Sequence, residues 1–345
     1  MIKEMRMRRF TGVMAALLML TGAARADDAP RLPSLKLDPA RVAVAGLSSG
    51  GYMATQVQMA YPEWFPAAAI VAAGPFGCAA GRLDLALSTC MKGVPAPDAA
   101  ALAARAKERS AKGDIGALKH LAHGRVYLLH GKDDALVSPV VAEAGARFYE
   151  ALREGDPALE SLQVTDDGGR AFAHNLPVAA AGDDCDKSVS PYLGHCGFDA
   201  AGEIFARLFG KALRGANDSK GELRRFNQDA YRPDGADAFL AAEGYIYLPP
   251  DCMAGKRCGL LVAFHGCKQN ADAVGEAFVK DAGFNRWADA YDVAVLYPQT
   301  RASTAPMNPQ ACWDWWGYSG EHYDSRQGVQ LRWLIGAVQA LGLRQ

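Results

Sequence analysis

Short apolar runs alternate with helix-compatible segments along most of the chain, and this alternation constrains the fold more than any other feature. Several runs are apolar throughout, which is typical of strands covered on both faces of a sheet. Strands that alternate with helices form mainly parallel sheets with helices on both sides, so the predicted fold class is α/β. The expected strands are 42–46, 68–74, 126–131, 245–249, 260–266 and 293–298, and the expected helices lie near 50–60, 99–109, 139–153, 199–213, 272–290 and 326–342.

One domain is predicted, spanning residues 27–345. The polar stretch 214–242 has the same strand and helix pattern on both of its sides, so it is interpreted as a connection within one domain. Residues 1–26 have the pattern of a secretory signal peptide: basic residues, the apolar run GVMAALLML, then Ala-Arg-Ala. The apolar run is shorter than the ~20 residues that cross a bilayer, so the mature chain is expected to lack a membrane span and to be secreted or periplasmic.

The cysteine count and the charge exclude several classes of partner. The chain has eight cysteines, and an even count in an exported protein indicates disulfides. No cysteine pair has the spacing of a zinc site, so no metal is expected. The formal net charge is −1 with no basic tract after the leader, which argues against nucleic acid as a partner. Pairing of sequence neighbours is the simplest arrangement: Cys78–Cys90, Cys185–Cys196, Cys252–Cys258 and Cys267–Cys312.

The stretch GLSSGGYMATQ joins an expected strand to an expected helix at residues 46–56. G-x-S-x-G in this setting is the nucleophile elbow of α/β-hydrolases, in which a sharp turn exposes the serine above the sheet. The spacing selects Ser48 rather than Ser49. A flexible turn rich in glycine and serine is the alternative, and the flanking strand and helix favour the elbow.

A serine nucleophile needs a base and an acid that orients the base, and in this fold both follow the serine in the order acid, then histidine. VYLLHGKDDALVSP places Asp133 and Asp134 just after a strand, and the distance from the His-Gly turn favours Asp134; helix capping is the alternative role. His174, in the loop GGRAFAHNLP, is the predicted base. His195 is the alternative, but it lies directly before Cys196.

Ester hydrolysis also needs an oxyanion hole, whose first donor is predicted to be the Ser49 amide. The second donor normally comes from a loop that precedes the nucleophile, but here too few residues precede it. LLVAFHGCKQN, late in the chain, has the features of that loop, which makes the Cys267 amide the second donor. His130 and His265 end strands in matching His-Gly turns and are interpreted as structural.

The chain is therefore predicted to be a circularly permuted α/β-hydrolase. The C-terminal LRWLIGAVQALGL is an amphipathic helix, and LKLDPARVAVAGLSSGG near the N-terminus is a turn and a strand. Joined, they would make one continuous helix–turn–strand–elbow unit. Termini of compact domains often lie close together, and permutation is tolerated there.

Seven motifs, in order, resemble the poly(3-hydroxybutyrate) depolymerases, in particular the single-domain, circularly permuted type known from fungi. They are GLSSGGYMATQ, HGKDDALVSP, AFAHNLP, SPYLGHCGFDAAG, FHGCKQN, AVLYPQ and NPQACWDWWGY. The resemblance implies a serine esterase that cuts poly(3-hydroxybutyrate) or its oligomers without a cofactor. It assigns Ser48 as nucleophile, His174 as base and Asp134 as orienting acid, with the amides of Ser49 and Cys267 as the oxyanion hole.

Large aromatic side chains near the C-terminus fit the binding of an uncharged polyester. Trp315, Trp316 and Tyr318 are the candidate substrate-binding residues, because flat apolar rings hold such a chain by burial and contact. Core packing is the alternative for any one of them. Two other functions stay open: a secreted feruloyl or acetyl esterase acting on plant polysaccharide esters, and a non-catalytic protein that binds hydrophobic polymer. A monomer is expected.

Overall fold

A computed structural model describes Met1, residues 29–216 and residues 219–344, and the predicted signal peptide lies outside the described residues. Its main element is an eight-stranded sheet in the order β4-β3-β2-β1-β10-β11-β9-β8, in which the strands from β4 to β11 pair in parallel and β9 pairs antiparallel with both β11 and β8. The α/β fold class is thus confirmed. The strands are β1 Leu37–Leu47, β2 Ala67–Val71, β3 Arg125–Gly131, β4 Gln163–Arg170, β8 Glu222–Asn227, β9 Glu243–Leu248, β10 Cys258–Phe264 and β11 Val293–Tyr297.

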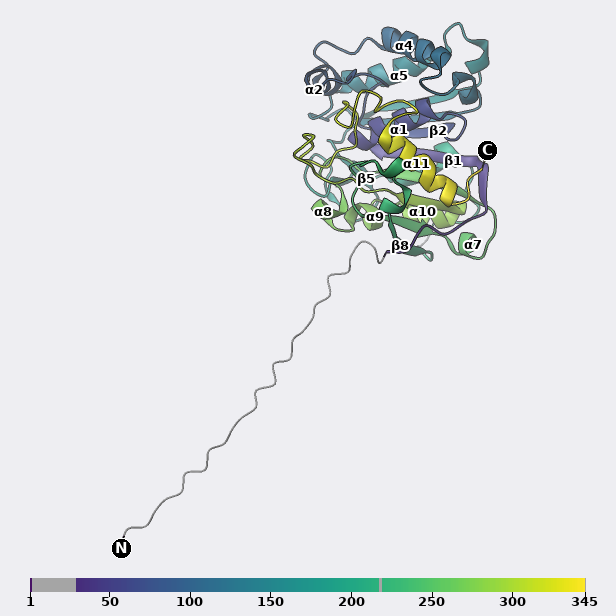
Figure 1. Cartoon of the computed structure of the whole chain (residues 1–345). Coiled ribbons are helices and arrows are strands. Elements are labelled where there is room, and N and C mark those ends of the chain that lie inside the picture. The colour runs from purple at the N-terminus through teal and green to yellow at the C-terminus, as the bar shows by residue number, and fades with distance from the viewer. Residues whose placement is uncertain (2–28, 217–218, 345) are drawn as a thin grey trace.

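Helices cover both faces of the sheet because the central strands are apolar on both sides. In β1, Val42 and Val44 pack into one buried cluster, and Ala43 and Ala45 pack into the cluster on the opposite face. Figure 1 shows α1 and α11 in front of the strands. The first face carries α1 Ser49–Ala60, α4 Ala99–Lys112, α5 Pro139–Arg153 and α11 Val329–Ala340, and the second carries α6 Ala200–Phe209, α9 Ala277–Asp281 and α10 Phe284–Tyr291.

The late strand β10 lies beside the early strand β1, as the permuted order requires. The two strands pair in parallel, with Gly46 opposite Phe264, so their carboxyl ends meet at one edge of the sheet. The ends of the described fold also meet, because the Leu35 amide donates to the Leu341 carbonyl at 2.7 Å. The end of α11 therefore lies beside the segment that leads into β1.

Some predicted elements differ from the structure in their extent. The helix expected near 272–290 is three helices, α8 Ala271–Val274, α9 and α10, because Gly275 and Gly283 have φ values of 60° and 86° that end a helix. Strands β4 and β8 were not predicted. Both are polar segments (QVTDDGGR and ELRRFN) at the edges of the sheet, where one side is exposed and the apolar signal is weak.

A small second sheet and the disulfides fix the long connections. The small sheet has the order β5 Leu176–Val178, β7 Leu193–His195 and β6 Asp183–Asp184.

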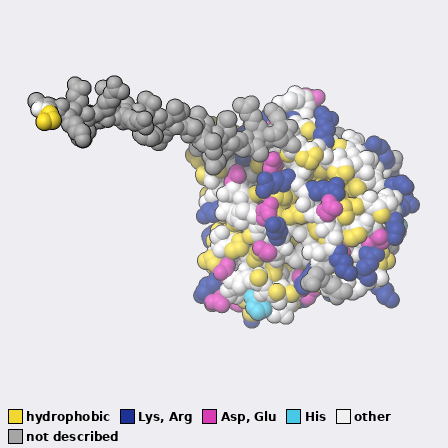
Figure 2. All heavy atoms as spheres, turned by 90° about the horizontal axis from the view of Figure 1, so that it is seen from below, with side chains coloured by type: hydrophobic (Ala, Val, Ile, Leu, Met, Phe, Trp, Pro, Cys, Tyr) yellow, Lys and Arg dark blue, Asp and Glu magenta, His cyan; other side chains and the backbone are white. Residues whose placement is uncertain are grey.

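Among the described residues no helix is long and apolar enough to cross a membrane. Figure 2 shows basic and acidic side chains interspersed on the face that it presents. The eight cysteines form the disulfides Cys78–Cys90, Cys185–Cys196, Cys252–Cys258 and Cys267–Cys312, which is the pairing of sequence neighbours.

Candidate active site

Ser48 lies at the sharp turn between β1 and α1. Its backbone angles, φ 58° and ψ −120°, are rarely adopted by a residue with a side chain, and its amide donates to the Val71 carbonyl at 2.8 Å. The glycines on both sides are required by packing. A Cβ at Gly46 would lie 2.2 Å from the Gly50 carbonyl oxygen, and one at Gly50 would lie 2.3 Å from the Phe264 carbonyl oxygen. The turn is therefore closed tightly enough to project the Ser48 side chain away from the sheet.

Asp134 and His174 form a buried pair. His174 Nδ1 lies 2.7 Å from Asp134 Oδ2, and the other carboxylate oxygen accepts the amides of Leu136 and Val137 at 2.8 and 2.9 Å. The Asp134 side chain is fully buried, whereas the neighbouring Asp133 is exposed. With Nδ1–H donating to the carboxylate, Nε2 of His174 is left free to accept a proton.

The loop that carries His174 is held from several sides. The His174 amide donates to Ser188 Oγ at 3.0 Å, and the Asn175 side chain donates to the carbonyls of Cys185 and Lys187. The disulfide Cys185–Cys196 closes the segment. His195, the alternative base, is exposed in β7 and does not line the cavity described below.

The late loop after β10 lies directly against the elbow. A Cβ built on Gly266 would be 3.5 Å from Ser48 Cβ and from the Leu47 carbonyl oxygen, so the Gly266 backbone is in contact with the turn. Within the part of the chain that the structure describes, neither the Ser49 amide nor the Cys267 amide donates a hydrogen bond to another protein group. Two free amides next to one serine are what an oxyanion hole requires.

Several contacts hold this late loop in place. The Lys268 amide donates to the Gln310 carbonyl at 2.7 Å, and Gln269 bridges the Gly266 amide and the Pro191 carbonyl at 2.8 and 2.9 Å. The disulfide Cys267–Cys312 adds a covalent link to the aromatic segment. The loop is thereby tied both to the His174 side of the cavity and to the opposite wall.

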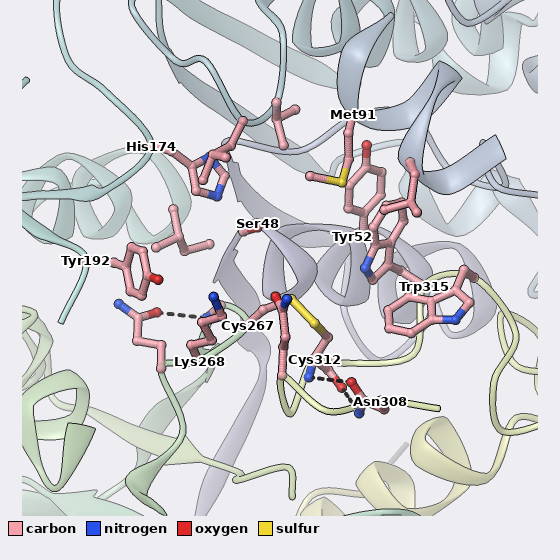
Figure 3. A pocket seen from close by; sticks show the side chains of 18 of the residues that line it. Ser48, Tyr52, Met91, His174, Tyr192, Cys267, Lys268, Asn308, Cys312 and Trp315 are labelled. Atoms are coloured by element: carbon pink, nitrogen blue, oxygen red, sulfur yellow. Dashed lines mark hydrogen bonds between the residues drawn. A yellow bond between two sulfur atoms is a disulfide. The ribbon is translucent and has the colours of Figure 1, made fainter. Parts of the chain in front are cut away.

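Ser48, His174 and Cys267 line one cavity of about 470 Å³. Figure 3 shows His174 and Tyr192 on one side of Ser48, Tyr52 and Trp315 on the other, and the disulfide Cys267–Cys312 below. The predicted nucleophile, base and second amide donor, which are far apart in sequence, are thus brought together. Asp134 lies behind His174 and does not reach the cavity itself.

Two of the three predicted aromatic binding residues line the cavity. Trp315 stacks on Tyr52 with ring centroids 4.4 Å apart and planes 9° apart, and Trp316 is next to it. Tyr318 is not part of the lining. Its half-buried side chain instead donates a hydrogen bond from the hydroxyl to the Cys312 carbonyl at 2.9 Å and accepts one from Gln330 at 3.0 Å, and these two bonds explain its position.

Asp314 holds the aromatic segment in shape. Its carboxylate accepts the backbone amides of residues 316–319, at distances between 2.6 and 3.3 Å. Burial raises the pKa of this carboxyl, and the Ser319 side chain and the amides of Gly317, Tyr318 and Ser319 act in the opposite direction. The segment also docks on the elbow helix, because the Gln56 side chain donates to the Asp314 carbonyl at 2.8 Å.

Sequence reasoning missed most of the apolar lining. The missed residues line the wall of the cavity or its mouth; they are Tyr52, Leu83, Leu87, Met91, Leu136, Val137, Tyr192 and Met307. One signal was available for part of the set. Leu83, Leu87 and Met91 repeat at intervals of four, the first two inside the segment closed by Cys78–Cys90 and the third directly after it, a spacing that places side chains on one face of a helix.

The elbow, the buried acid–base pair and the parallel sheet together define the α/β-hydrolase class, in a permuted form. The family model described as Esterase PHB depolymerase matches residues 243–340. A polyhydroxybutyrate depolymerase of Talaromyces funiculosus is 32% identical over 350 residues, which cover 96% of this chain and 98% of that protein. The chain belongs to the poly(3-hydroxybutyrate) depolymerase family of carboxylic ester hydrolases, so the expected family is confirmed.

Two further comparisons agree with this family. A poly(3-hydroxybutyrate) depolymerase of Delftia acidovorans is 35% identical over 328 residues, covering 92% of this chain; the chain spans 62% of the length of that protein. A solved structure of a PHB depolymerase variant complexed with an R3HB trimer superimposes with a TM-score of 0.80 at 30% identity. The superposition covers 90% of this chain and 98% of the chain in that solved structure. The relation therefore extends over nearly the whole described fold.

Proposed function

We propose that this protein is a secreted serine esterase that hydrolyses poly(3-hydroxybutyrate) or its oligomers. Ser48 is the nucleophile, His174 the general base, Asp134 the orienting acid, and the amides of Ser49 and Cys267 form the oxyanion hole. The observation that supports this most strongly is that the late loop 265–267 lies against Ser48, in the cavity that His174 also lines. The four disulfides support an oxidising compartment outside the cytoplasm.

The reaction proceeds in two steps. Ser48 Oγ attacks the ester carbonyl carbon while its proton passes to His174 Nε2, and the two amides stabilise the negative carbonyl oxygen. The bond from the carbonyl carbon to the alcohol oxygen then breaks, and the alcohol leaves with the proton from His174. Water repeats the sequence on the acyl-enzyme, which releases the hydroxyacid and restores Ser48. Each step uses side chains and amides of this chain, and no cofactor takes part.

The cavity supports a polyester as the substrate. Its lining is mostly apolar, with leucine, methionine and aromatic side chains around a few polar groups next to Ser48. A chain of hydroxybutyrate units is uncharged and carries methyl groups, so it gains free energy by burial on such a wall. The trimer named in the related solved structure supports the same substrate class. We expect the enzyme to act as a monomer.

Two measurements test the proposal. A fluorophosphonate probe should label the protein, and Ser48→Ala should abolish both labelling and ester hydrolysis, because no second activated serine lines the cavity within the described residues. Labelling that persists in Ser48→Ala would reject the nucleophile, and no labelling of the native protein would favour a non-catalytic binding role. Incubation with polyhydroxybutyrate granules, with hydroxybutyrate oligomers and with a feruloyl ester separates the substrates; hydroxybutyrate release supports the proposal, and cleavage of the feruloyl ester alone overturns it.

A further inference from the structure

His130 occupies an unusual position behind the acid–base pair. It lies at the end of β3, is 2% exposed, and its Nε2 is 3.9 Å from Asp134 Oδ2. This oxygen is the one that accepts from His174 Nδ1. The Asp134 carboxylate is therefore flanked by two imidazoles, one at hydrogen-bond distance and one just beyond it.

The His130 ring has no partner of its own. Among the described residues neither Nδ1 nor Nε2 has a partner at hydrogen-bond distance, although both atoms are buried. Polar atoms buried in this way are rare, because leaving water without a replacement partner costs free energy. A ring that served only to fill space could be apolar, so the retained nitrogens point to an electrostatic role.

The surroundings determine the charge of this ring. Burial lowers the pKa of His130 and His174 reinforces the lowering, while Asp134, the Val137 backbone and Glu143 act in the opposite direction. On its other side the ring faces a small cavity of about 220 Å³, lined by Glu143 of α5 and Asp166 of β4. The ring is neutral near neutral pH, and its N–H edge is its positive end.

We propose that His130 is a positioning residue that presents its Nε2–H to Asp134 Oδ2, and so keeps this carboxylate directed at His174. The proposal rests on the triad assigned above. At 3.9 Å the contact is longer than a hydrogen bond, so the attraction is that of a ring dipole for a buried charge. His130 is absent from the lining of the catalytic cavity, and it therefore acts through Asp134 and not on the substrate.

The proposal predicts a specific change in the pH profile. Without the dipole, Asp134 is held less firmly, so the His174 imidazolium that forms during catalysis loses part of its stabilisation. The plateau of kcat/KM then falls and the acid limb of the profile shifts, because the Asp134–His174 pair has lost a neighbouring dipole. A purely structural defect would reduce the fraction of active enzyme, but it would leave the acid limb where it is.

The experiment compares three substitutions at one position by measuring kcat/KM against pH with a soluble short-chain ester. In His130→Leu and His130→Phe, which have no N–H, the plateau should fall on the order of tenfold and the acid limb should shift. His130→Gln, whose amide can reach the place of Nε2, should restore both. His130→Phe keeps a planar ring of similar size, so it serves if His130→Leu does not fold.

A matched control lies on the opposite side of the ring. Glu143→Gln removes a charge from the small cavity without touching Asp134, so it should leave both plateau and limb unchanged. An unchanged profile in the Leu and Phe variants would overturn the proposal, and so would equal defects in the Gln and Phe variants. Native protein without esterase activity would instead overturn the proposed function, which separates the two failures.

Discussion

His130-Gly131 at the end of β3 and His265-Gly266 directly after β10 are the same dipeptide at the same edge of one sheet, but the two imidazoles are held in opposite ways. His265 Nδ1–H donates to the Gly266 carbonyl at 2.7 Å, and Nε2 accepts the Thr300 amide at 3.2 Å. His130 has neither kind of bond and faces a carboxylate instead. One histidine holds its own loop, whereas the other acts on a neighbour.

The glycines of the two turns also differ. A Cβ on Gly131 would lie 2.0 Å from the Phe172 carbonyl oxygen, in the loop that carries His174, whereas one on Gly266 would meet nothing closer than 3.4 Å. The first turn is thus packed against the base, and the second lies open toward Ser48. Each turn delivers one component of the proposed site, Asp134 by its side chain and Cys267 by its amide. A shared local sequence therefore leads to different roles once neighbouring elements are added.

The largest expected effect comes from the carboxylate that the first turn delivers. Asp134→Asn should lower kcat by about 10⁴-fold, because an amide cannot hold His174 in the tautomer that leaves Nε2 free. Asp133→Asn is the matched control, since that side chain is exposed, and it should stay within about twofold. Steady-state kinetics on a soluble ester measure both variants. Equal losses, or a larger loss in Asp133→Asn, would show that the wrong aspartate has been chosen.

The next effect compares the two glycines directly. Gly131→Ala pushes a methyl group into the Phe172 backbone, so it should displace His174 and lower kcat/KM by about 10²-fold. It should also lower the free energy of unfolding by about 1–3 kcal/mol, the usual cost of overpacking. Kinetics and urea unfolding report the two quantities separately.

Gly266→Ala is the control for this substitution. Its methyl group would be at ordinary contact distance from Ser48 Cβ, so the free energy of unfolding should change by less than about 0.5 kcal/mol. If Gly266→Ala destabilised the protein as much as Gly131→Ala, the two turns would not differ in packing as described.

The sequence predicted the sheet centre and the elbow well, because both depend on local patterns. Continuous apolar runs identified the central strands, and the glycines around Ser48 reflect close backbone contacts that only glycine permits. The late loop could also be placed beside the elbow from the sequence, since the proposed oxyanion hole needed a second donor. These inferences depend only on the local sequence pattern of each segment and on the groups that ester hydrolysis needs.

The rest depended on which segments meet in space. Nothing in the leucine-rich segment near Leu83 shows that it faces Ser48, and the polar edge strand β4 has no apolar pattern to detect. Tyr318 follows two lining tryptophans but turns away to bond Cys312 and Gln330. The two histidines were given one structural role from their shared motif, and only the surroundings in the fold separate them.

The last expected effect concerns stability alone, and it is a pH dependence at the second turn. Burial lowers the pKa of His265 to about 4, so the folded protein binds this proton less readily than the unfolded chain does. Stability is therefore complete above about pH 6.5, falls as the pH drops toward 4, and loses roughly 3 kcal/mol from this group. Urea unfolding at several pH values should show a shallower fall in His265→Gln, which has no group to titrate there. Parallel pH curves for the two proteins would mean that burial does not keep the His265 ring neutral in the folded protein.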